Sequence, residues 1–159
     1  MTGPPEPDAL GTLLRHVLEQ IDADVATVYR ERGLADYRPR FSPLVRALVA
    51  HGPMSIRALA QRVGVTHSAA SQTVAAMRRA EFVRLSSGTD ARQRIVELTP
   101  RATDLLPLIE SEWNATTAAI RELDAELPMP LSELLARVDA ALRRRPLRQR
   151  ITEAGLGDH

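Results

Sequence analysis

The side chains best suited to chemistry lie close together between residues 66 and 79. This stretch combines hydroxyl, amide, imidazole and guanidinium groups. A serine can donate or accept a hydrogen bond at a base edge, a glutamine can bind adenine through two atoms, and arginine pairs with phosphate. These residue types predict contact with double-stranded DNA, and the candidate residues are Thr66, His67, Ser68, Ser71, Gln72, Arg78 and Arg79.

The stretch also has the two faces of a packed helix. At 100° per residue, Ala70, Val74 and Met77 fall within about 60° of one another, and the small polar residues lie on the opposite side. A solvated surface helix would show the same pattern. Thr66 favours the DNA interpretation, because a capped helix N-terminus attracts phosphate, and so do the neighbouring arginines, including Arg57 and Arg62.

A hairpin follows this helix. Two β-prone stretches, Phe82–Leu85 and Arg94–Leu98, flank a turn-rich segment that contains Gly88. Asp90 and Arg92 stand two residues apart, so the carboxylate can hold the guanidinium for entry into a minor groove. A local surface ion pair is the alternative reading of that pair. Arg94 is a candidate for a phosphate contact.

The elements that must position these residues begin and end at recognisable signals. Asp8 is expected to cap a long helix that ends near Gly33, and Ser42-Pro43 to cap and open a second helix that Gly52 ends. Ser55 is expected to cap a short third helix closed by Gly64, after which Thr66 caps the fourth, reaching about Ala80. A short helix, a tight turn, a second helix and a hairpin form the pattern of a winged helix-turn-helix.

Two further helices are expected after the hairpin. The first opens at Thr99-Pro100, should kink or break at Pro107, and ends at residues 127–130. The last runs over about residues 131–145, and its apolar stripe predicts burial of Leu134, Leu135, Val138 and Leu142.

Composition excludes several classes of function. The 159 residues are 44% hydrophobic and 26% charged, as in ordinary globular domains, and contain no cysteine, so thiol redox chemistry and thiolate metal sites are excluded. The four histidines lack metal-ligand spacing, and no nucleophile and base are paired as in an enzyme. We therefore expect no metal, no cofactor and no catalysis, in a cytoplasmic protein that lacks a signal peptide or membrane span.

Charge is unevenly distributed along the chain. The net charge is only +1, yet residues 41–101 carry nine arginines and three acids, and residues 102–142 carry two arginines and eight acids. The basic segment is either a footprint for phosphate or a surface that the acidic flanks neutralise. The cluster at residues 143–145 could pair with those acids or reach phosphate.

Several short motifs resemble those of the MarR (multiple antibiotic resistance regulator) family of bacterial transcription factors. They are Leu-Ala-Gln-Arg-Val-Gly-Val-Thr at residues 59–66, Met-Arg-Arg at 77–79, Asp-Ala-Arg at 90–92 and Leu-Thr-Pro at 98–100. The resemblance implies an obligate dimer with intertwined first and last helices that commonly represses a promoter until a small ligand or an oxidant intervenes. Glu81 and Ala102 depart from it, since glycine is usual at both positions, and the turn into Phe82 is therefore open to a different construction.

The sequence thus predicts a mainly α protein: a winged helix-turn-helix with a two-stranded β-wing, plus N- and C-terminal helices forming a dimerisation region. Its expected divisions are a flexible leader (1–7), an N-terminal dimerisation helix (8–40), the DNA-binding module (41–101), C-terminal dimerisation helices (102–146) and a tail (147–159). The expected function is a homodimeric transcriptional repressor of a pseudo-palindromic site, released by a small noncovalent ligand if it has one. A winged-helix module that docks onto protein is the alternative.

Overall fold

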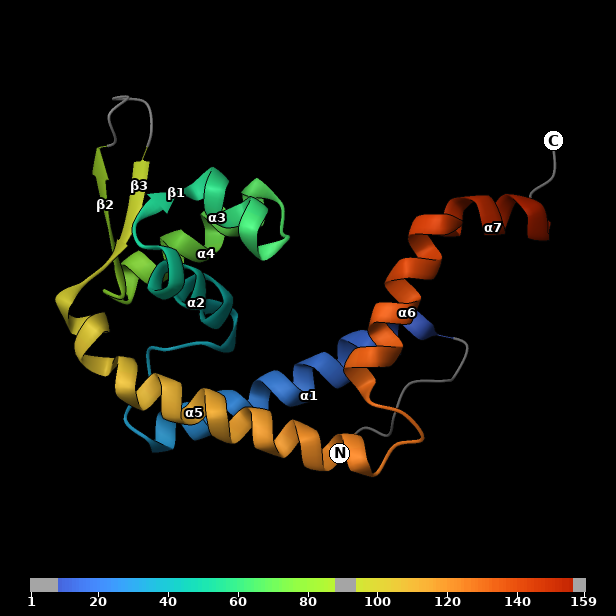
Figure 1. Ribbon diagram of the computed structural model, residues 1–159, viewed down its shortest axis with the longest axis horizontal. Coiled ribbons are helices and arrows are strands. Elements are labelled where there is room, and N and C mark those ends of the chain that lie inside the picture. The colour runs from blue at the N-terminus through green and yellow to red at the C-terminus, as the bar shows by residue number, and fades with distance from the viewer. Residues whose placement is uncertain (1–8, 88–93, 156–159) are drawn as a thin grey trace. The chain divides into compact units, whose positions relative to one another are not determined.

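The computed structural model describes residues 9–87 and 94–155 and is mainly helical (Figure 1). The chain divides into two compact units, residues 1–112 and 113–159, and each is described by itself. The helices are α1 (Leu10–Glu31), a short 3₁₀ helix (Pro39–Phe41), α2 (Ser42–His51), α3 (Ile56–Val63), α4 (His67–Arg79), α5 (Pro100–Ala125), α6 (Leu131–Arg144) and α7 (Leu147–Ala154). The strands are β1 (Met54–Ser55), β2 (Val83–Ser87) and β3 (Arg94–Leu98).

Helix α1 ends as predicted, but it begins one residue later than the predicted cap requires. Its N-cap position is Ala9, which has no capping side chain, and Asp8 lies outside the described residues. At the other end Gly33 takes a φ of 82°, and the Leu34 N–H donates to the Tyr29 carbonyl over 2.7 Å. The glycine therefore supplies the left-handed residue that closes the helix.

An aromatic cluster forms the centre of the first unit. Tyr37 packs edge-on against Tyr29, Phe41 and Phe82, with ring centroids 4.9, 5.7 and 5.2 Å away. All four side chains are at most 2% exposed. Because they come from α1, the α1–α2 connection and the residue before β2, this cluster joins the N-terminal helix to the winged module.

Ser42 has a different role from the predicted one. It is the first residue of α2 rather than its cap, because the 3₁₀ helix Pro39–Phe41 leads directly into α2. Its hydroxyl accepts a hydrogen bond from the Tyr37 hydroxyl at 3.2 Å and lies 3.4 Å from that of Tyr29. The serine therefore satisfies buried tyrosines, a role that depends on contacts from outside its helix.

The helix-turn-helix has the predicted boundaries. Ser55 caps α3 by accepting from the Ala58 N–H at 3.2 Å, and Gly64 closes it with a φ of 76°. Thr66 caps α4 by accepting from the Ala69 N–H, also at 3.2 Å. Local sequence signals were sufficient here because each cap acts within three residues.

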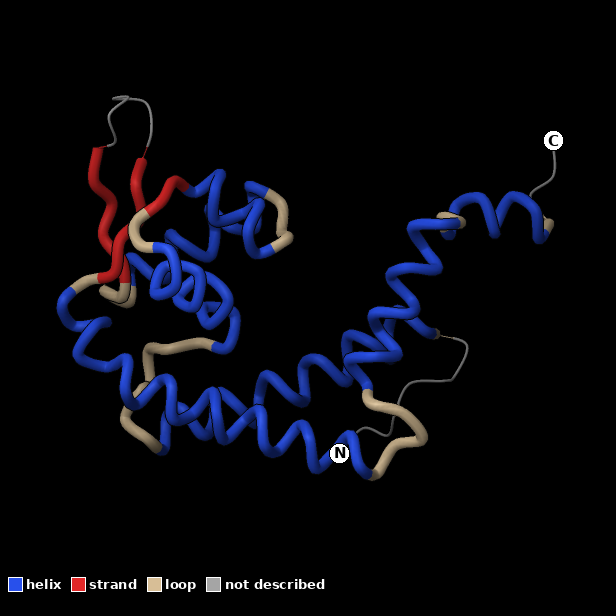
Figure 2. The backbone as a smooth tube through the Cα atoms, in the orientation of Figure 1, coloured by secondary structure: helices blue, strands red, loops and turns tan. Residues whose placement is uncertain are grey.

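The sheet has three strands rather than the two predicted, in the order β1-β3-β2 and antiparallel throughout (Figure 2). Met54 and Ser55 pair with Val96 and Ile95. Two residues are too few to show strand alternation, so β1 is visible only through its partner. Phe82, predicted as a strand residue, precedes β2 and is 1% exposed.

The turn between α4 and β2 is built around Glu81, the only residue other than glycine with positive φ in the described part of the chain, at 59°. The N–H groups of Glu81 and Phe82 donate to the carbonyls of Arg78 and Met77 over 3.0 and 2.9 Å. This is a Schellman closure with glutamate at the position that glycine usually takes. The turn therefore has the usual backbone construction although it lacks glycine. The left-handed conformation of Glu81 costs about 1 kcal/mol or more.

Replacing Glu81 with glycine is expected to raise the free energy of unfolding by roughly 0.5–1 kcal/mol, since glycine adopts positive φ without steric cost. The carboxylate itself contributes little, because it is 79% exposed and 3.9 Å from Arg101. Urea denaturation measures the change. Glu81→Ala is the matched control, because it removes the carboxylate and keeps the Cβ atom; equal stability of the two variants would contradict the strain.

Ala102 lies in α5 and is 1% exposed. Its N–H donates to the Thr99 hydroxyl over 3.1 Å, so Thr99 caps the start of this helix. Alanine suits a buried helical position better than the usual glycine does. Helix α5 also continues through Pro107, so the predicted break is absent.

The second unit contains the end of α5 and the helices α6 and α7. The α6 stripe is not buried within one chain: Leu134, Leu135, Val138 and Leu142 are 46%, 47%, 46% and 41% exposed. The segment after Pro146, predicted as a tail, holds α7. No helix among the described residues is long and apolar enough to cross a membrane.

Candidate nucleic-acid interface

Helix α4 has one buried face and one exposed polar face. Ala70, Val74 and Met77 are at most 1% exposed and pack into the core, as the helical spacing predicts. Ser68 and Gln72 are exposed on the other side, and Ser71 is half-buried. None of these three side chains hydrogen-bonds to another described residue, so the polar groups are available to a ligand. Thr73, in contrast, donates to the Ala69 carbonyl at 3.0 Å.

The N-terminus of α4 is open to solvent. Thr66 and His67 are both exposed, and the Thr66 hydroxyl is occupied by its capping bond to Ala69. The helix dipole leaves partial positive charge at this end, where phosphate binds favourably. The structure thus brings Thr66, His67, Ser68, Ser71 and Gln72 onto one accessible surface.

The nearby arginines differ in their partners. Arg78 and Arg79 are exposed in the last turn of α4, and neither pairs with a carboxylate of the described residues. Arg62 lies 3.0 Å from the His51 ring through Nη1 and Nε2, which ties α3 to α2. Arg57 is exposed on α3. Among the residues that the structure describes, Arg57, Arg78 and Arg79 therefore have no carboxylate partner and are available to an anion.

Only part of the predicted wing is described. Arg94 is exposed at the start of β3, opposite Ser87 of β2. Asp90 and Arg92 lie outside the described residues, so their predicted pairing stays a prediction. Arg84 pairs across the hairpin with Glu97 over 2.9 Å, so its charge is already matched.

Sequence reasoning missed Arg101, which connects the end of α4 to the rest of the first unit. Its Nη1 donates to the Ala80 carbonyl at 2.5 Å, and its Nη2 lies 3.4 Å from Asp36. The guanidinium also stacks over Phe82, with Cζ 5.2 Å from the ring centroid. Arg101 therefore helps to fix the C-terminal end of the exposed helix. No local signal marks it, because Asp36 is 65 positions away.

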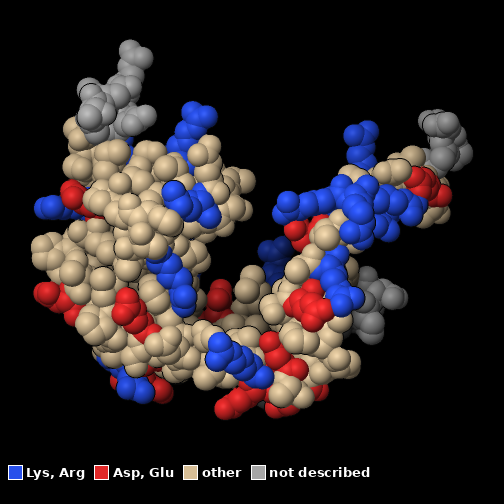
Figure 3. Space-filling view, viewed as in Figure 1, with Lys and Arg blue, Asp and Glu red and all other residues tan. Residues whose placement is uncertain are grey.

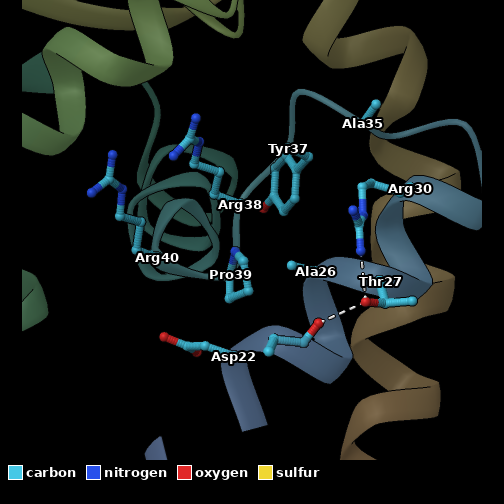
Figure 4. A pocket seen from close by; sticks show the side chains of 10 residues that line it. Asp22, Ala26, Thr27, Arg30, Ala35, Tyr37, Arg38, Pro39 and Arg40 are labelled. Atoms are coloured by element: carbon cyan, nitrogen blue, oxygen red, sulfur yellow. Dashed lines mark hydrogen bonds between the residues drawn. The ribbon is translucent and has the colours of Figure 1, made fainter. Parts of the chain in front are cut away.

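Two hollows border the connection between α1 and α2. The larger, about 530 Å³, lies between α1 and this connection and includes Thr27, Arg30 and Tyr37 (Figure 4). The smaller, about 320 Å³, lies between the connection and the end of α4. Among the described residues, no group of three or more acidic or histidine side chains is placed to hold a metal ion.

The arginine cluster at residues 143–145 pairs in part with acidic residues, which was one of its two predicted roles. Arg143 pairs with Asp139 over 2.8 Å within α6, and Arg145 pairs with Glu153 of α7. Figure 3 shows arginine side chains gathered over α6 and α7. Pairing with the acidic stretch thus accounts for Arg143, and pairing with a later acid for Arg145.

Comparison with known proteins finds a family match within the winged module. Residues 42–93 match a family model described as the MarR family, and the predicted resemblance is confirmed. No curated protein matches the sequence.

Three solved structures share the fold over most of the chain. M. tuberculosis MOSR in complex with DNA is 25% identical, with 86% of this chain and 98% of that one covered and a TM-score of 0.64. The S. aureus MepR–DNA complex is 15% identical, with coverages of 83% and 94% and a TM-score of 0.63. PcaV from Streptomyces coelicolor, in complex with its natural ligand, is 16% identical, with coverages of 93% and 99% and a TM-score of 0.62.

Proposed function

We propose, from the match of residues 42–93 to the MarR family model and from the winged helix-turn-helix around them, that this chain is a DNA-binding transcriptional regulator. We propose further that it acts as a homodimeric repressor at a pseudo-palindromic promoter site, without catalytic activity, in the cytoplasm where that DNA lies. The observation that carries the proposal is the polar face of α4, on which Ser68, Ser71 and Gln72 have no hydrogen-bond partner within residues 9–87 and 94–155.

The residues around α4 support DNA rather than another partner. The N-terminus of this helix is exposed and capped, and Arg57, Arg78 and Arg79 have no carboxylate partner among the described residues. Phosphate contacts set the position of a reading helix, and base contacts set its specificity. Both kinds of group occur on this one face. MOSR and MepR, which share the fold, are each solved with DNA.

Uncovered apolar side chains support the homodimer. On α1, Leu10, Leu14 and Leu18 are 66%, 52% and 58% exposed. The stripe of α6 is exposed to a similar degree, and on α7 Leu147 and Ile151 are 59% and 46% exposed. Complete burial of a fully exposed side chain of this kind is worth about 1.5–3 kcal/mol, and burial of these partly exposed ones contributes a part of that. A second copy of the chain supplies matching helices, and two copies would present two reading helices to one palindromic site.

Salt dependence is the sharpest test of the proposal. Fluorescence anisotropy with DNA fragments selected from the genome should give an association constant that falls log-linearly with salt, with a slope of roughly −0.9 for each phosphate contacted. Sedimentation should show a dimer at the same protein concentration. Binding that is insensitive to salt, or selection of no fragment at low salt, would favour the protein-docking alternative and overturn DNA recognition.

Release by a ligand is part of the same proposal. Because the chain has no cysteine, a signal cannot act through thiol oxidation, and we propose a noncovalent ligand instead. PcaV, which shares the fold, is solved with its natural ligand.

A further inference from the structure

Three arginines surround the smaller hollow beside α4. Arg38 and Arg40 come from the connection between α1 and α2, and Arg79 comes from the last turn of α4. The hollow measures about 320 Å³, and its walls include the buried side chains of Phe41 and Ala76. Residues nearly 40 positions apart thus meet around one concave surface, supported on rigid core residues.

The charges around this hollow are unbalanced. Asp36 is its one acidic residue, and that carboxylate is directed to Arg101, 3.4 Å from Nη2. Arg38, Arg40 and Arg79 have no ion-pair partner among the described residues. Like charges held close together repel one another, and this repulsion is relieved when an anion lies between them.

The arginine side chains of the connection also point the same way. Figure 4, a view of the larger hollow, shows Arg38 and Arg40, which line both hollows, extending away from Asp22 of α1. Arg40 keeps this position beside Phe41, with its Cζ 6.0 Å from the ring centroid. Guanidinium groups bind carboxylate and phosphate oxygens in pairs, so two such groups on one short segment suit an anion with several such oxygens.

We propose that this hollow binds a small anion that carries two or more carboxylate or phosphate groups, with Arg38, Arg40 and Arg79 as its ligands. A volume of about 320 Å³ is at the lower end of ligand pockets, which matches a compact metabolite rather than a large aromatic one.

A bound anion affects DNA binding through Arg79, an effect that rests on the proposed function. Arg79 lies on α4, among the residues proposed to contact DNA. A bound anion neutralises Arg79 and holds its side chain toward the hollow. The regulator then loses a phosphate contact in each subunit, so the anion weakens DNA binding.

Direct binding tests the site without DNA. Isothermal titration of the full chain with citrate and, separately, with inorganic pyrophosphate at constant ionic strength should show saturable binding of one anion per chain. The two probes distinguish carboxylate from phosphate ligands. The double variant Arg38→Ala/Arg40→Ala should lose at least about 10-fold in affinity, as expected when charge-assisted bonds are removed.

The matched control is Arg121→Ala/Arg144→Ala, which removes two exposed arginines of the second unit that have no carboxylate partner among the described residues. It should bind the probes as the parent does, and thermal melting of both double variants should show intact folds. Absence of saturable binding by either probe, or equal losses in the two double variants, would overturn the proposal.

A second measurement separates this site from the DNA interface. The better probe should lower DNA affinity in the parent and leave the Arg38→Ala/Arg40→Ala variant unaffected. Should that variant alone weaken DNA binding and flatten its salt dependence, the arginines would belong to the DNA interface and the anion site would be wrong. Probe binding in a protein that binds no DNA would instead keep the site and reject the proposed function.

Discussion

Gln72→Glu is expected to weaken DNA binding by about 3 kcal/mol, or roughly 150-fold, without loss of the fold. Gln72 is exposed in the middle of α4, on the face opposite Ala70 and Met77. Its amide can donate to one base atom and accept from another, whereas a carboxylate can only accept. The substitution keeps the size of the side chain and adds a negative charge close to the phosphates, once in each subunit.

Anisotropy at a fixed salt concentration measures this loss. Gln20→Glu provides the matched control, because it makes the same chemical change at an exposed position of α1. The control should retain DNA affinity within a factor of about two, as a distant surface charge is screened. If the two variants bind equally well, α4 is not the reading helix and the proposed interface is wrong.

Phe41→Ala is expected to destabilise the protein by about 3–5 kcal/mol. The Phe41 side chain is 0% exposed and packs near Tyr37 and Phe82, with ring centroids 5.7 and 6.2 Å away. Its removal leaves a cavity where the α1–α2 connection meets the winged module. Because ordinary domains have only about 5–15 kcal/mol of stability, the loss is a large part of the total.

Urea or thermal unfolding followed by circular dichroism measures this change. Val49→Ala is the comparison on the neighbouring helix α2, where the side chain is 43% exposed and its loss should cost under about 1 kcal/mol. Similar destabilisation by the two substitutions would show that the aromatic cluster is not the main source of stability in this unit.

Sequence reasoning succeeded where the determining contacts are local. Ser55, Gly64 and Thr66 each act on backbone groups only a few residues away, and the structure places all three as predicted. The buried face of α4 follows from helical periodicity in the same way, because Ala70, Val74 and Met77 share one side of a helix whatever surrounds it.

Features that depend on distant partners were missed or misread. Ser42 is a residue type that commonly caps helices, but its hydroxyl contacts the hydroxyls of two tyrosines from other segments. Strand β1 exists through its pairing with β3, and the Arg101 bonds to Ala80 and Asp36 connect three segments. The apolar stripe of α6 has the spacing of a buried face and is exposed within one chain, which is why we assign its cover to a second copy.

The amino-acid sequence therefore determined the winged helix-turn-helix and the polar face of α4, because caps, turns and helical periodicity act over a few neighbouring residues. Tertiary structure alone decided how Arg101 holds the end of α4 and how Arg38, Arg40 and Arg79 come to surround one hollow. Such groupings arise when the folded backbone brings separate segments together, and they cannot be predicted from the spacing of residues along the chain.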